Sequence, residues 1–194
     1  MSKHFSAICA AVFCTADFAF ATTLVAVDIS ELSQSSDVVV RGTVKRVSSR
    51  WTSDHMRIVT DVEIEVAEAL KGSPEKSVTV TQPGGVVGDI GQKVSGLASF
   101  EGGEEVVVFL ERRGQSRFLV SGMAQGKFRI ERSSDGRAVF AVPDGANDAR
   151  LVDPITRESI GPRVRTMKLE ELKELVRVAK VRPKGPRTLK PSVP

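Results

Sequence analysis

The segment from Ile58 to Leu70 alternates apolar and charged residues in a way that constrains its secondary structure. The acidic residues Asp61, Glu63 and Glu65 alternate with the apolar residues Val62, Ile64 and Val66. Because successive side chains of a strand point to opposite faces, this alternation predicts a half-buried β-strand and argues against a helix. We therefore interpret the three acidic residues as the solvated face of a strand, rather than as a metal or acid–base site.

The run 38–47 is rich in β-branched residues and predicts an antiparallel partner for this strand, joined to it by a turn centred near Ser53. A one-residue slip would move the valines from the core into water, so the pattern favours one register. Cross-strand pairs on the outer face would each contribute roughly 0.2–1 kcal/mol. The predicted pairs are Val44 with Val62, Val40 with Val66, Lys45 with Asp61, and Arg41 with Glu65.

The remaining patterns predict a mainly β chain with a helix near each end. Asp28 is expected to cap a short helix over 28–36, and apolar residues at helical spacing predict an amphipathic helix over 168–179. The segment 105–111 is apolar on both faces, which is typical of a central strand. Further strands are predicted at 77–81 and 118–120 and as a hairpin of 128–131 with 138–142, whereas 143–162 reads as irregular.

The first 21 residues have the three parts of a secretion signal. Lys3 precedes an apolar run over 5–16, and small residues at Ala19 and Ala21 predict cleavage before Thr22. We therefore expect an exported protein, in the periplasm or outside the cell. Cleavage would remove Cys9, Cys14 and His4, so no disulfide is expected in the exported chain.

Charge is concentrated near the C-terminus. Residues 22–162 carry 17 basic and 20 acidic side chains, whereas residues 163–194 carry 10 basic and 3 acidic ones. The sequence pI of about 9.3 therefore reflects the end of the chain, and no nucleic-acid partner is expected for the main domain. We expect one domain over 22–181, a disordered basic Pro-rich tail over 182–194, and no membrane span.

Three segments carry a resemblance to a known family. They are Ser36-Asp37-Val38-Val39-Val40-Arg41-Gly42-Thr43-Val44, Glu65-Val66-Ala67-Glu68-Ala69-Leu70-Lys71-Gly72 and Gly103-Glu104-Glu105-Val106-Val107-Val108-Phe109-Leu110. They resemble strands of netrin-like modules, the OB-fold family that includes the tissue inhibitors of metalloproteinases. Together with Gly122-Met123-Ala124-Gln125-Gly126-Lys127-Phe128, they also resemble a group of uncharacterised exported bacterial proteins.

This resemblance implies a small OB-like, netrin-module-like β-barrel over roughly residues 35–130. It does not imply the family's inhibitory chemistry. Those inhibitors chelate the protease zinc through an N-terminal cysteine, whereas the predicted mature chain begins at Thr22 and has no cysteine. We therefore treat the resemblance as evidence on the fold, which does not by itself confer function.

The glycine-rich segment 84–103 invites a phosphate-binding interpretation, but its spacing does not fit one. Gly91 is followed by Gln92-Lys93-Val94 instead of the Lys-Ser/Thr of a P-loop, and no G-x-G-x-x-G occurs in the segment. We expect a long hairpin or a loop between barrel strands, with a binding loop as the alternative. The candidate partner-binding residues in it are Gly84, Gly85, Gly88 and Gly91.

The sequence offers few groups for catalysis or metal binding. His55 is the only histidine after the predicted cleavage site, which argues against catalytic zinc and against a serine–histidine pair. Oxygen ligands for calcium occur at 144–153, but their spacing does not match an EF-hand loop, so we favour a turn-rich connector. They are Asp144, Asn147, Asp148 and Asp153. No catalytic residue, metal or cofactor is therefore predicted.

Trp51 lies in the predicted first hairpin with Arg50 and Arg57 nearby. It could stack on a sugar or base, as OB-folds use aromatic residues, or it could pack against the barrel end. We expect an exported, non-catalytic binding module that recognises a protein or an envelope polysaccharide through Trp51, Arg50, Arg57 or the glycine-rich loop. The alternatives are a protease-inhibitor-like module acting through a loop and, third, a hydrolase of unknown type.

Overall fold

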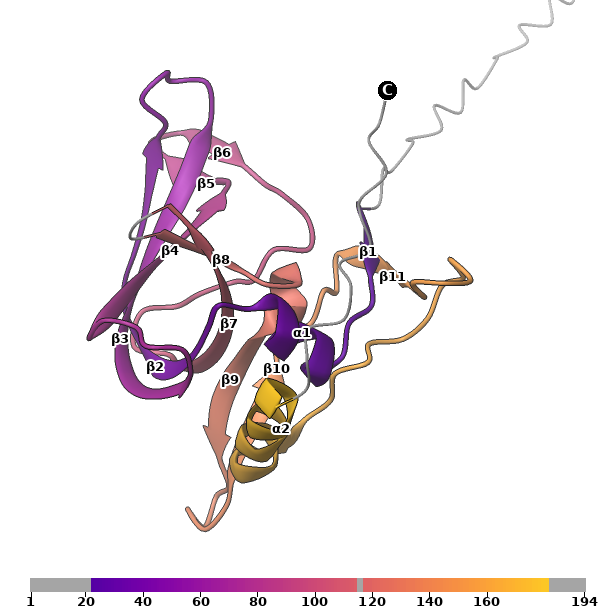
Figure 1. The fold of residues 1–194 in the computed structure, drawn as a ribbon. Coiled ribbons are helices and arrows are strands. Elements are labelled where there is room, and N and C mark those ends of the chain that lie inside the picture. The colour runs from indigo at the N-terminus through magenta and orange to yellow at the C-terminus, as the bar shows by residue number, and fades with distance from the viewer. Residues whose placement is uncertain (1–21, 115–116, 182–194) are drawn as a thin grey trace, which may run out of the picture.

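The computed structural model describes residues 22–114 and 117–181 (Figure 1). The predicted signal segment 1–21 and the predicted tail 182–194 lie outside the described residues. The helices are α1 (Ile29–Ser35) and α2 (Leu169–Val181), and a short 3-10 turn spans Met123–Gly126. The strands are β1 (Thr22–Val25), β2 (Val38–Trp51), β3 (Ile58–Lys71), β4 (Ser77–Pro83), β5 (Gly85–Val87), β6 (Ile90–Gln92), β7 (Glu105–Arg113), β8 (Arg117–Val120), β9 (Lys127–Arg132), β10 (Val139–Pro143), β11 (Ala149–Val152) and β12 (Met167–Lys168).

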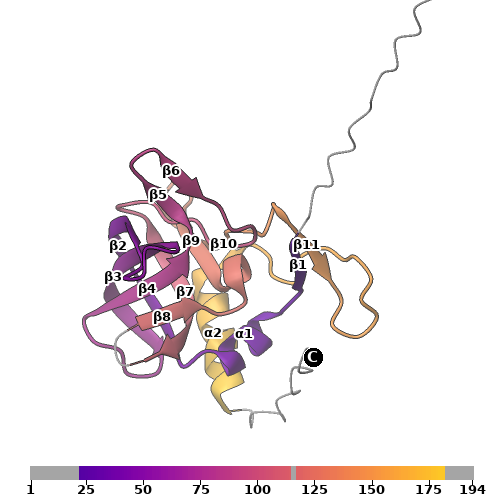
Figure 2. The same ribbon diagram turned by 90° about the horizontal axis from the view of Figure 1, so that it is seen from above.

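Eight strands form one mixed sheet in the order β12-β10-β9-β7-β2-β3-β4-β8. β7 also pairs with β8, so that β7, β2, β3, β4 and β8 close into a partial ring (Figures 1 and 2). β4 and β8 are parallel and pair at Thr79–Arg117 and Val80–Phe118, whereas the other neighbours in this sheet are antiparallel. The prediction of a mainly β chain with two helices is confirmed.

β7 separates the two largest hydrophobic clusters of the described chain. Val106, Val108 and Leu110 belong to the cluster formed by the strands of the ring. Val107 and Phe109 belong to the cluster that α1, α2, β9 and β10 cover from the other side. All five side chains are fully buried. The segment 105–111 is therefore central, as its apolar run predicted.

The predicted register of β2 and β3 is wrong by two to three residues. The turn is centred later than Ser53, because Asp54 organises it by accepting hydrogen bonds from Thr52 Oγ1 at 2.5 Å and from the Met56 amide at 3.1 Å. A register irregularity between Val44 and Arg46 reduces this departure from three residues to two. The observed pairs include Val44 with Ile64, Val47 with Val62, Val40 with Ala69 and Arg41 with Glu68.

The outer face of β2 and β3 pairs basic with acidic residues, but with other partners than predicted. Asp61, Glu63 and Glu65 each contact a basic side chain of β2, which agrees with their interpretation as a strand face. The distances are 3.2 Å for Lys45–Glu65, 3.2 Å for Arg46–Glu63 and 2.7 Å for Arg50–Asp61. Arg41 instead pairs with Glu105 of β7 at 2.5 Å and with Glu68 at 3.7 Å.

The two helices pack against the sheet face opposite the ring interior. α1 begins with the predicted cap: Asp28 accepts from the Glu31 amide at 2.8 Å, and Glu31 accepts from the Asp28 amide at 2.8 Å. Leu172 and Val176 of α2 are fully buried in the same cluster as Phe109. Helix α2 therefore docks on the sheet through its apolar face, as the sequence predicted.

The segment 143–162, expected to be irregular, contains a strand. β11 pairs in parallel with β1, so these two strands, which are far apart in the chain, form a separate two-stranded sheet. Leu151 of β11 and Ala26 after β1 are buried in a small cluster that also includes Ala124 and Ala146. Sequence patterns did not indicate this contact because it joins two short segments far apart in the chain. No helix of residues 22–114 and 117–181 is long and apolar enough to cross a membrane.

Candidate functional site: a groove beside the β5–β6 hairpin

The glycine-rich segment folds into a short hairpin, β5–β6, that packs against the end of the β2–β3 pair. Gly84 has φ +92° and Gly85 has φ +131°, a region that favours glycine. A Cβ atom at Gly85 would lie 2.3 Å from Ser49 Oγ and 2.4 Å from Thr60 Oγ1. The hairpin therefore needs glycine at Gly85 in order to reach the hydroxyl groups of β2 and β3.

Polar contacts fasten the base of this hairpin. Thr60 Oγ1 donates to the Gly84 carbonyl at 2.7 Å and lies 2.9 Å from Ser49 Oγ. Gln92 Oε1 accepts from the Ile58 amide at 2.9 Å. The β5–β6 hairpin is thus positioned by its first and last residues, while its tip extends away from the core.

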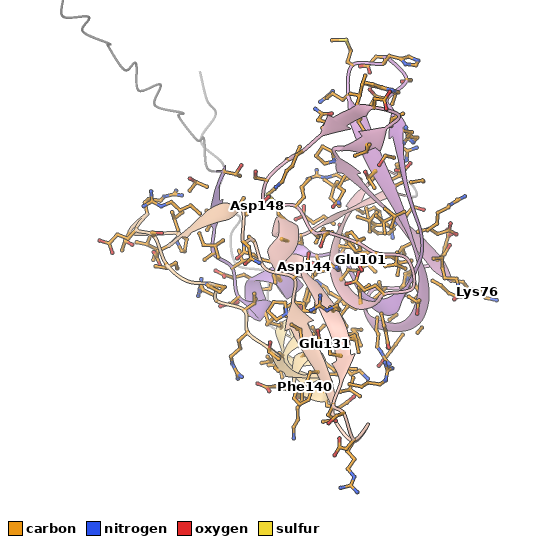
Figure 3. The ribbon with its side chains drawn as sticks, turned by 180° about the vertical axis from the view of Figure 1, so that it is seen from behind. Lys76, Glu101, Glu131, Phe140, Asp144 and Asp148 are labelled. Atoms are coloured by element: carbon orange, nitrogen blue, oxygen red, sulfur yellow. The ribbon has the colours of Figure 1, made fainter. Side chains whose placement is uncertain are left out.

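A wide groove of about 820 Å³ lies between this hairpin and the 144–148 loop. We call it the hairpin groove. Figure 3 labels Asp144 and Asp148, the two carboxylates of this loop that line the groove. Its lining residues are Thr60, Gln82, Pro83, Gly84, Gly85, Val86, Gly91, Gln92, Lys93, Val94, Leu97, Ala98, Ser99, Asp144, Gly145, Asn147 and Asp148.

Lys127, which is buried, holds the far wall of the groove in place. Its side chain is 1% exposed, and its Nζ donates to Glu104 Oε1 at 2.8 Å and to Asp144 Oδ1 at 3.3 Å. The same Nζ donates to the Ser99 carbonyl and lies 4.8 Å from the centre of the Phe100 ring. The Lys127 ammonium group therefore connects β9 to segment 99–104 and to the 144–148 loop, both of which contribute residues to the groove wall.

Asp148 anchors the other end of this wall. Its Oδ1 accepts from the Gly96 amide at 2.8 Å, and its Oδ2 lies 3.5 Å from Lys93 Nζ. These contacts hold the pKa of Asp148 below its ordinary value, the Gly96 hydrogen bond most strongly. Ser99 contributes a matching bond, because its amide donates to Asp144 Oδ2 at 2.9 Å. Each carboxylate of the groove is thus bonded to a backbone amide and lies beside a lysine.

The structure brings three of the four predicted glycines to the groove. Gly84, Gly85 and Gly91 line it, whereas Gly88 lies in the turn between β5 and β6 and is exposed. Gly84 and Gly85 have a structural role as described above. Gly91 differs from them, because a Cβ there would meet only Val86 Cγ2, at an ordinary 3.7 Å.

The predicted residues of the first hairpin lie elsewhere. Trp51 is half-buried at the end of β2, opposite Ile58, and Arg50 pairs with Asp61 at 2.7 Å. Arg57 is exposed in the turn. Trp51, Arg50 and Arg57 are not among the residues that line the hairpin groove. The two predicted candidate regions therefore do not form one site.

The oxygen-bearing residues of 144–153 do not converge on one point. Asp144, Asn147 and Asp148 line the groove, but Asp153 instead closes its own turn by accepting from the Ile155 and Thr156 amides. Within the described ranges, no three His, Cys, Asp or Glu side chains are grouped to hold a metal ion. His55 is exposed at the β2–β3 turn.

Sequence reasoning missed Lys127, the residue that organises the groove wall. Its immediate neighbours give no signal, because Glu104, Asp144 and the Ser99 carbonyl come from other segments. It also missed Gln82 and Thr60, which line the groove from the ring strands. These residues reach the groove through contacts between segments that are distant in the chain, and local sequence patterns do not indicate such contacts.

Comparison with known proteins adds no name to this geometry. The chain matches no protein-family model, and a search of curated proteins found no match either.

Proposed function

We propose that this chain is an exported binding module and that it recognises a protein partner through the hairpin groove. The observation that carries the proposal is the groove itself. It joins an exposed hairpin to a wall that a buried lysine fixes in place. Binding sites are commonly built from loops that a rigid scaffold positions.

The proposed scaffold is an OB-like barrel. Five strands, β2, β3, β4, β7 and β8, pair around the partial ring out of chain order. This order agrees with the partly open, five-stranded Greek-key barrel of OB-folds. It also agrees with the resemblance of the segments at 36–44, 65–72 and 103–110 to netrin-like modules.

A protein partner fits the groove better than an envelope polysaccharide does. The lining includes no aromatic side chain on which a sugar ring could stack. It offers backbone groups of four glycines and apolar side chains instead. Val86 and Ile90 of the hairpin are 68% and 55% exposed, so the hairpin presents two apolar side chains that a protein partner could cover.

Binding is also favoured over hydrolysis by the state of the polar groups. The Ser99 hydroxyl donates to Asp144, and the Thr60 hydroxyl donates to the Gly84 carbonyl. The Lys127 ammonium is paired with two carboxylates. A serine or threonine nucleophile needs a base that is free to accept its proton. Among the described residues, the Thr60 hydroxyl contacts only a carbonyl and another hydroxyl, and the Asp144 carboxylate beside Ser99 already accepts from Lys127 and from the Ser99 amide.

Photo-crosslinking in cells that naturally produce the protein tests this proposal. A benzophenone amino acid at Val94, which lines the groove, should give a discrete protein adduct. The same group at Ile155, which is 88% exposed and outside the groove, is the matched control and should give none. Equal adducts at both positions, or a groove adduct that glycosidases remove, would contradict a protein partner. N-terminal sequencing of the recovered chain should begin at Thr22 if it is exported as proposed.

A further inference from the structure

We infer that the partner enters the groove as an extended, apolar peptide segment that pairs as a third strand with the free edge of β6. This inference rests on the proposed binding function and adds the form in which the partner binds. Peptides recognised in this way gain affinity from main-chain hydrogen bonds to an exposed sheet edge.

The first support is the unpaired edge of β6. In the described residues, β6 pairs with β5 alone, and Ile90, Gly91 and Gln92 are all exposed. Two of its three residues, Gly91 and Gln92, line the groove. An exposed strand edge presents N–H and C=O groups that are ready to pair with another chain.

The second support is the register of the hairpin. Val87 pairs with Ile90 across the two-residue turn, and Val86 pairs with Gly91. The two residues that flank a two-residue turn are hydrogen-bonded to each other through both backbone amides and carbonyls. In the next pair, the amide and carbonyl of each residue point away from the partner strand. The amide and carbonyl of Gly91 therefore face away from β5, toward the open edge.

The third support is the presence of glycine at Gly91. Unlike Gly84 and Gly85, Gly91 has an ordinary φ, and a Cβ there would make only an ordinary contact. The hairpin alone does not require glycine at this position. Glycine within a strand often marks a site where another backbone approaches closely, which fits an incoming strand.

The charges of the groove favour an apolar segment over a strongly charged one. Lys127 compensates Asp144, and Lys93 lies beside Asp148. The near-buried pair of Lys127 and Asp144 offers no free charge to an acidic or basic peptide, and the exposed Lys93 and Asp148 have opposite signs. The exposed side chains of Val86, Ile90 and Val94 instead offer contacts for apolar residues along the added strand.

The test selects peptides from a phage-displayed library of random 12-residue sequences on the intact exported chain. The best peptide is then synthesised with a single N-methyl group at each position in turn. A strand uses alternate amides for pairing, so alternate N-methyl groups should weaken binding about tenfold, and those between them should have little effect. This measurement leaves the protein unchanged and does not depend on the folding of a variant.

Protein variants map the peptide to β6. Gly91→Pro removes the outward amide and should weaken binding by at least tenfold, while Gly91→Ala, which keeps it, should have a smaller effect. Gly102→Ala is the matched control, because a Cβ there meets nothing within 4 Å and Gly102 is outside the groove. Failure to select any peptide, a pattern without alternation, or full binding by Gly91→Pro would overturn the inference. If the Val94 photo-crosslink to a protein is still obtained in any of these cases, the proposed binding function stands. The partner would then bind through a folded surface instead of an extended segment.

Discussion

The β2–β3 and β5–β6 hairpins lie at the same end of the molecule, and different contacts hold them in place (Figure 1). The strands of the first are 14 residues long, bury one face in the ring and carry ion pairs on the other. The strands of the second have three residues each and are fixed by glycines and by a few hydrogen bonds at the base. The side chains of the long hairpin are therefore committed to folding, whereas the short hairpin leaves apolar side chains exposed.

The largest effect is expected at Lys127, whose contacts hold the wall that faces the short hairpin. Lys127→Met should destabilise the protein by about 3–5 kcal/mol, because it leaves buried carboxylates without their cation. Urea unfolding measures this loss. Lys76→Met, at an exposed lysine on the β3–β4 connection, is the control and should change stability by less than about 0.5 kcal/mol. Equal effects for the two variants would contradict the role given to Lys127.

Substituting one valine in each hairpin tests how much each hairpin contributes to stability. Val62→Ala in β3 removes fully buried methyl groups from the ring cluster and should cost about 2 kcal/mol. Val86→Ala in β5 affects a side chain that is mostly exposed, so its cost should stay within about 0.5 kcal/mol. The same urea experiment checks both. A large loss in Val86→Ala would show that the short hairpin is part of the folding core after all.

Gly85→Ala should detach the short hairpin and leave the long one folded. The new Cβ would overlap the hydroxyls of Ser49 and Thr60, but release of β5 and β6 relieves that overlap. We therefore expect a global loss of only about 1–2 kcal/mol, with faster hydrogen exchange confined to residues 85–92. Gly91→Ala is the control and should leave exchange unchanged. Faster exchange spread through β2 and β3 would mean that the two hairpins unfold together.

The smallest effect concerns pH and the ion pairs of the long hairpin. Burial alone would raise the pKa of Asp61, but hydrogen bonds from Thr81 and Arg50 outweigh it and lower the pKa below the ordinary 3.8. A lowered folded pKa stabilises the protein above the unfolded value, and this contribution disappears as pH falls through the folded value. Stability should therefore decrease as the pH falls below about 4, with a smaller decrease in Asp61→Asn. Urea unfolding at a series of pH values checks this, and identical pH dependence in both proteins would contradict it.

Sequence patterns predicted the scaffold better than the groove. The alternation at 58–70 and the apolar run at 105–111 correspond to β3 and β7 because the side chains of these strands have one fixed environment on each face. The capping of α1 by Asp28 was equally local. The register of β2 and β3 was mispredicted because the hydrogen bonds of Asp54 shift the turn, and bulges in long strands leave little trace in composition.

The groove could be predicted only in part. Its glycines were visible in the sequence, but their meaning depends on contacts. Gly85 is required by the hydroxyls of Ser49 and Thr60, whereas Gly91 is not required by the fold. The opposite wall comes from 144–148 through Lys127, and the sequence does not show that these segments meet.

The double burial of β7 has a consequence for how the molecule comes apart. Its five central side chains point alternately into the two major clusters. If β7 moved to release the packing of one cluster, the other cluster would lose its β7 side chains as well. The helices α1 and α2 and the ring should therefore melt in a single cooperative transition rather than as two independent units. The short β5–β6 hairpin contributes no residue to either cluster, so we expect it to open locally without unfolding the rest of the molecule.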